Sequence, residues 1–135
     1  MDLMESLMIS AAGMRAQGQR LRVVAENLAN ADSVSEAPGG DPYRRKTISF
    51  KNQLDRELGM ETVQVGKVGE DPSDFRMKYD PGNPAADAKG YVKLPNVNSL
   101  IEMSDMREAQ RSYEANLKAI EVARNMLQRT IDLIR

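Results

Sequence analysis

The stretch that decides the fold is LMESLMISAAGMRAQGQRLRVVAENLANA, which spans residues 3–31. It contains no proline, and its apolar residues recur at the spacing of an amphipathic helix. Four of them lie on a strict seven-residue step: Leu7, Met14, Leu21 and Leu28. Such a step is typical of helices that pack along a coiled-coil seam. The sequence therefore predicts a long N-terminal helix with a seam along one side.

The other end of the chain carries a second seven-residue row, made of Met106, Tyr113, Ile120, Leu127 and Ile134. It predicts a helix from about Asn98 to Arg135, roughly 55 Å long at a rise of ~1.5 Å per residue. Apolar or small residues flank the N-terminal row on both sides, a stripe wider than one neighbouring helix covers. Periodicity alone leaves two interpretations open: lateral self-association, or a monomeric α+β domain whose helices pack on a small sheet.

The middle of the chain differs in composition, because residues 32–96 hold all six prolines and most of the glycines and aromatic residues. Alternating apolar residues predict short strands around Ile48–Phe50, Val63–Val65 and Phe75–Tyr79. A short run that Pro95 closes predicts a fourth at Tyr91–Leu94. The expected fold is mainly α with a small β-rich middle. We expect residues 1–31 and 97–135 to form one axial helical domain as a coiled-coil-like pair, with 32–96 as a β-rich segment between them.

The composition excludes most catalytic and metal chemistry. The 135 residues include no Cys and no His, so thiolate nucleophiles, imidazole bases, disulfides and ordinary zinc sites are ruled out. With 19 Lys+Arg against 20 Asp+Glu, the chain lacks the basic footprint of a nucleic-acid-binding protein. We therefore expect no catalytic residue, no cofactor, no metal site and no enzyme activity. No stretch is apolar enough to predict a membrane span.

Four polar features invite both a structural and a functional interpretation. Asn30 is a candidate cap for the first helix. Asn27 precedes a seam residue and could hydrogen-bond across a helix interface, although spacing slightly favours a solvated side chain, and Asn116 lies on the flank of the second seam. The basic run Arg44-Arg45-Lys46 predicts a solvated strand start or, alternatively, a docking patch for an acidic neighbour.

Several motifs carry a resemblance to a known family. Residues 9–17 (ISAAGMRAQ), with Arg20-Leu21 and residues 27–31 (NLANA), resemble the N-terminal signature of bacterial flagellar rod and hook proteins. Residues 41–46 (DPYRRK), 79–84 (YDPGNP), 94–98 (LPNVN) and 111–116 (RSYEAN) narrow the resemblance to proximal-rod subunits, across essentially the whole chain. The residues that match the family motif are Asn27, Leu28, Ala29, Asn30, Arg111, Ser112, Tyr113 and Asn116. The chain departs from the pattern at Glu26, where the family more often has a small or amide residue.

The resemblance implies a structural protein of the flagellar basal body that polymerises into a helical tube. It implies terminal helices in an inner layer and the middle segment outside. The implied partners are the chain itself, other rod subunits, the adaptor that joins the rod to the membrane ring, and the flagellar type III export apparatus. The implied location is the periplasm-spanning rod, and the acidic N-terminus, which lacks a basic n-region, predicts export without a cleaved signal peptide.

Two other classes stay open at this point. A monomeric helical-hairpin adaptor or interaction protein would fold independently of concentration. A hydrolase that works with carboxylates alone would need a cleft lined by paired acids.

Overall fold

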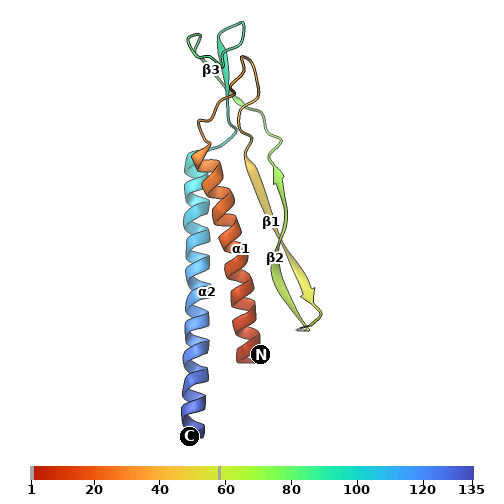
Figure 1. Cartoon of the computed structure of the whole chain (residues 1–135), viewed down its shortest axis with the longest axis vertical. Helices are drawn as coiled ribbons and strands as arrows, with labels where there is room; N and C mark the ends of the chain where they lie inside the picture. The colour runs from red at the N-terminus through yellow and green to blue at the C-terminus, as the bar shows by residue number, and fades with distance from the viewer. Residues whose placement is uncertain (1, 58) are drawn as a thin grey trace. The chain divides into compact units, whose positions relative to one another are not determined.

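The computed structural model describes residues 2–57 and 59–135. Its elements are two long helices at the ends and four strands between them (Figure 1), namely α1 (Leu3–Ala29), β1 (Lys46–Asp55), β2 (Met60–Glu70), β3 (Arg76–Tyr79), β4 (Tyr91–Leu94) and α2 (Ser99–Ile134). This order confirms the predicted fold class. Each of the four predicted strands is present, and β1 and β2 extend well beyond the alternating residues that predicted them.

Side chains cap both helices. At the start of α1, the backbone N–H of Asp2 donates to the Glu5 carboxylate at 3.0 Å. At its end, Asn30 Nδ2 donates to the Glu26 carbonyl at 2.9 Å, so Asn30 caps the helix as predicted. It does so without a left-handed backbone conformation, since among the described residues only glycines have positive φ. At the start of α2, the side-chain oxygen of Asn98 accepts from the Leu100 N–H at 3.1 Å.

The strands form two small sheets, β1–β2 and β3–β4. Strands β1 and β2 run in opposite directions in Figure 1, and Gly59, with φ of 64°, lies in the turn between them. Strands β3 and β4 are antiparallel, with Tyr79 opposite Tyr91 and Lys78 opposite Val92. The Val92 side chain is 1% exposed, so this face of the β3–β4 sheet lies against the interior.

The chain divides into two compact units, each built from helix and strand segments. One unit comprises residues 1–21, 48–67 and 107–135, and the other comprises residues 22–47 and 68–106. We call them the helix-tail unit and the junction unit. The buried apolar residues of the helix-tail unit are all alanines: Ala12, Ala16, Ala109 and Ala123. Those of the junction unit include two alanines, Ala31 and Ala85, but also the larger Val23, Val24, Val92 and Val97.

Candidate functional site

In the helix-tail unit, α1 and α2 approach closely at Gly13. A Cβ atom built on Gly13 would lie 2.8 Å from Nδ2 of Asn116, well inside van der Waals contact. The Asn116 amide itself donates to the Ser112 carbonyl of the preceding turn at 2.9 Å. Asn116, predicted on the flank of the seam, thus lies between the helices at the one position of α1 where a missing side chain makes room for it.

Small residues at this contact leave the larger seam residues at its margins. The buried positions of α2, Glu102, Ala109 and Ala123, follow a seven-residue register beside the predicted one. The predicted seam residues Leu7, Met14, Leu21, Leu28, Met106, Tyr113 and Ile120 are half-buried. Leu127 and Ile134 are exposed. Much of the predicted seam therefore remains accessible to solvent in the single chain.

Helix α2 exposes further large apolar side chains along its length, including Leu117, Val122, Met126, Ile131 and Leu133. Soluble monomers seldom expose large contiguous apolar surface, and such surface commonly marks a protein–protein interface. The helix thus has the character of an assembly surface.

The junction unit contains a polar network centred on Asn27, whose side chain is 1% exposed. Its Nδ2 donates to the Lys46 carbonyl at 2.9 Å and to Glu102 Oε2 at 3.2 Å. Its Oδ1 accepts from the Tyr43 hydroxyl at 2.8 Å and from the Lys46 N–H at 2.9 Å. All the hydrogen-bonding positions of the amide are filled. The expectation of a solvated Asn27 was therefore wrong, and the amide ties the end of α1 to the start of β1 and to α2.

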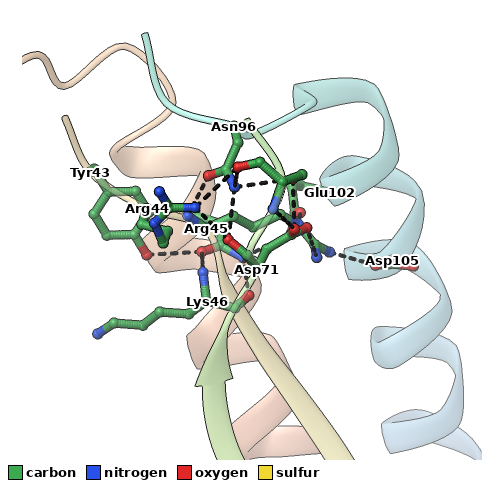
Figure 2. Close-up of polar contacts among 10 residues, drawn as sticks. Tyr43, Arg44, Arg45, Lys46, Asp71, Asn96, Glu102 and Asp105 are labelled. Carbon is green, nitrogen blue, oxygen red and sulfur yellow. Dashed lines mark hydrogen bonds and ion pairs between the residues drawn. The ribbon is translucent and has the colours of Figure 1, made fainter. Parts of the chain in front are cut away.

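Arg45 and Glu102 form the charged part of this network (Figure 2). Glu102 lies in the first turn of α2 and is fully buried, and its Oε1 accepts a hydrogen bond from Arg45 Nε. The guanidinium also lies 3.5 Å from the Asp71 carboxylate and 4.0 Å from that of Asp105. One arginine therefore balances acids from α2 and from the segment after β2, which is how a buried carboxylate is accommodated.

The backbone of Arg45, like its side chain, forms hydrogen bonds with other segments. Its N–H donates to Asn96 Oδ1 at 2.8 Å, and its carbonyl accepts from the Asp71 N–H at 2.9 Å. Arg44 lies over the Phe75 ring, 4.2 Å from the centroid, and donates to the carbonyls of Asp71 and Ser73. The run Arg44-Arg45-Lys46 is thus neither a simple solvated strand start nor a patch awaiting an external acid, because its acidic partners belong to the same chain.

Protonation equilibria reflect the same contacts. Hydrogen bonds from the Ser73 side chain and backbone, together with the Arg45 charge, lower the pKa of Asp71. Burial alone lowers the pKa of Arg45, but the hydrogen bond and charge of Glu102 outweigh it, so the pKa is raised. A hydrogen bond to Glu26 raises the pKa of Lys46. Each shift stabilises the charged form, as expected for a network that joins segments rather than one that transfers protons.

Sequence reasoning missed Glu102, Asp71 and Asn96 as partners of this network. The sequence held one usable signal for Glu102. It lies on the same seven-residue row as Ala109 and the predicted seam-flank residue Asn116, so burial of that row buries an acid as well. Of the family-motif residues, Asn27 and Asn116 lie at contacts between helices. Arg111 and Ala29 are exposed, and Ser112, Tyr113 and Leu28 are half-buried.

The described residues show neither a group of metal-binding side chains nor a membrane-spanning helix. Among them, nowhere do three or more His, Cys, Asp or Glu side chains gather to hold a metal ion. Neither helix is both long and apolar enough to cross a membrane.

Comparison with known proteins decides the family. The family described as "Flagellar basal body rod FlgEFG protein C-terminal" matches residues 88–133. A flagellar basal-body rod protein FlgC from Agrobacterium fabrum is 56% identical over 127 residues, covering 94% of this chain and 91% of the relative. The chain belongs to the FlgC family of flagellar basal-body rod proteins. FlgC proteins from Aquifex aeolicus and Bacillus subtilis are 44% and 38% identical, with 97% and 99% of their length covered.

Membership of the FlgC family confirms the resemblance that the motifs indicated. The relatives match 98% of this chain in the Aquifex and Bacillus comparisons, so the similarity includes both long helices and the β-rich middle. The C-terminal family match covers β4 and most of α2.

Proposed function

We propose that this chain is a structural subunit of the bacterial flagellar proximal rod, and that it assembles with copies of itself and with other rod proteins into the drive shaft of the basal body. The observation that carries the proposal is the near-full-length identity to FlgC rod proteins. The apolar residues exposed along α2 supply a driving force for assembly, since burying one Leu or Ile side chain against a neighbouring subunit contributes about 1.5–3 kcal/mol of binding free energy.

Within the rod, residues 1–31 and 97–135 form the helical layer and residues 32–96 the outer part. The half-buried and exposed seam residues then complete their burial against neighbouring subunits. The closely packed alanine and glycine contact between α1 and α2 supports this arrangement, because it holds the helices together while leaving the larger side chains outside.

The further partners are the adaptor that joins the rod to the membrane ring and the flagellar type III export apparatus, and the rod spans the periplasm. Export requires a chain that unfolds readily, and the absence of cysteine excludes disulfide crosslinks. Residues 1–31 are retained after export, because α1 begins at Leu3, and Leu3 and Ser6 line a groove together with Val122 of α2. Mass spectrometry of purified basal bodies should find a peptide that begins at Met1 or Asp2. A uniform start near Ala12 or Ala31 would contradict retention.

Complementation of a strain that lacks the subunit tests the proposal. The wild-type chain should restore swimming, whereas Leu21→Asp and Leu127→Asp should not, because each places an unpaired charge in an assembled seam at a cost of several kcal/mol. The control Gln128→Asp adds the same charge at an exposed position next to Leu127 and should swim. Normal swimming of both seam variants would reject the seam, and failure of the wild-type chain to restore swimming would reject the function.

A further inference from the structure

Helix α2 carries unpartnered apolar side chains at both of its ends. At its start, Leu100 is 79% exposed, and Ile101 and Met103 are at least half-exposed. Near its end, Leu133 and Ile134 are 87% and 81% exposed. These two patches lie in different units and have different neighbours, so each must be considered separately.

A groove of about 480 Å³ borders the start of α2, and most of its lining residues are polar. Leu100 and Val97 line the helix side, and Asp32 and Asp74 lie among the polar residues. Within residues 2–57 and 59–135, neither of these two carboxylates forms an ion pair. The groove also contains Arg76, which donates to the Pro95 carbonyl at 3.3 Å. The groove thus combines one exposed apolar side chain, Leu100, with an excess of negative charge.

The other end of α2 has the opposite charge. Residues 124–135 contain three arginines, Arg124, Arg129 and Arg135, against the single acid Asp132. The same sign difference holds for the whole units, since the helix-tail unit has 11 Lys+Arg and 9 Asp+Glu, and the junction unit has 8 and 11. The apolar patches are therefore matched by complementary charges.

We propose that the end of α2 of one copy docks into the groove at the start of α2 of a second copy. Leu133 and Ile134 would cover Leu100 and Ile101, and Arg129 and Arg135 would face Asp32 and Asp74. Because the two surfaces differ, the contact is heterologous and leaves a free patch at each end of the pair. Repetition therefore gives an open helical assembly rather than a closed dimer. The inference rests on the proposed function, for which it supplies a subunit contact.

The absence of cysteine permits a direct test by site-directed crosslinking of the full-length chain. Purified Leu100→Cys and Ile134→Cys chains are mixed at assembling concentration and oxidised. We expect a crosslinked dimer that joins the two different variants, in clear excess over the mixture of Leu100→Cys with the control Gly82→Cys. Gly82 suits the control because it is exposed and a Cβ there would meet nothing within 4 Å. Equal yields in the two mixtures, or a predominant Ile134–Ile134 crosslink, would overturn the proposal.

Charge reversal tests the electrostatic part with the same crosslink. The double change Asp32→Lys and Asp74→Lys in the Leu100→Cys chain should lower the yield, and Arg129→Asp with Arg135→Asp in the Ile134→Cys chain should restore it. Loss without restoration would overturn the assigned pairing. A swimming assay of the two cysteine variants under reducing conditions distinguishes failure of this contact from failure of the proposed function. If the variants swim normally but give no crosslink, this contact is rejected and the rod function is retained.

Discussion

Arg45 and Glu102, 57 residues apart in the sequence, form an ion pair in which the carboxylate side chain is 1% exposed and the arginine 23%. Arg45 precedes β1, whereas Glu102 lies in the first turn of α2. A carboxylate this deep needs a cation and further donors, which Arg45 and the Asn27 amide supply. The pair therefore fastens the start of the β-rich middle to the second long helix.

Removing the Glu102 carboxylate should destabilise the junction unit strongly. Glu102→Ala removes the buried carboxylate that accepts from both Arg45 and Asn27, and it leaves Arg45 only the more distant carboxylates of Asp71 and Asp105. We expect a loss of about 1.5–3 kcal/mol in the free energy of unfolding, the range for hydrogen bonds to charged groups. Urea unfolding measures it. The matched control is Glu108→Ala, because that carboxylate also pairs with an arginine, Arg20, but is 68% exposed. Its loss should be below about 1 kcal/mol. Similar losses for the two variants would contradict the role assigned to the buried pair.

Adding a methyl group at Gly13 should displace the Asn116 side chain. Gly13→Ala places its Cβ 2.8 Å from Nδ2 of Asn116, so the Asn116 side chain must move and lose its hydrogen bond to the Ser112 carbonyl. This loss should offset the gain in helix propensity that alanine brings. Gly18→Ala is the control, since a Cβ there meets nothing within 4 Å, and better helix propensity should stabilise the chain by up to about 1 kcal/mol. Asn116→Ala should relieve much of the Gly13→Ala defect. Gly13→Ala should therefore be the less stable of the two variants, and equal stabilisation by both would reject the close contact.

Acid should weaken the junction unit through Asp71. Its pKa is lowered in the folded state by Ser73 and Arg45, so the folded state binds fewer protons than the unfolded state near pH 4. The contribution of Asp71 is present above the unfolded pKa of about 3.9 and is lost as pH falls through the folded pKa. Asp71→Asn should therefore be less stable than the wild-type chain at pH 7, with a gap that narrows towards pH 3. A gap that stays the same across this range would contradict the prediction.

The free subunit should protect its amides unevenly. The last turns of α2 expose Leu133 and Ile134, and helices without packing partners are only marginally stable. Hydrogen exchange at dilute concentration should be fast at the ends of both helices and slow around Val92 and Val97 in the junction unit. Strong protection throughout Leu7 to Leu28 would contradict this and would favour a stable monomer.

The sequence by itself predicted the two terminal helices, the four strands and the family. Helix periodicity, proline and glycine placement and short motifs such as Asn27 to Asn30 are local properties of the chain, so they can be recognised without coordinates. The same local signal predicted that the row of large apolar residues Met106, Tyr113 and Ile120 forms the seam of the second helix.

Only the tertiary structure decided which row faces the other helix and which polar residues are buried. The row of small residues that contains Ala109 and Ala123 is the buried one, because two helices pack more closely where their side chains are short. Burial of Asn27 and Glu102 depends on donors and acceptors from Tyr43, Arg45 and Lys46, which lie far along the chain. A polar side chain is stable in the interior only when such partners converge on it, and that convergence is a property of the folded backbone rather than of residue spacing.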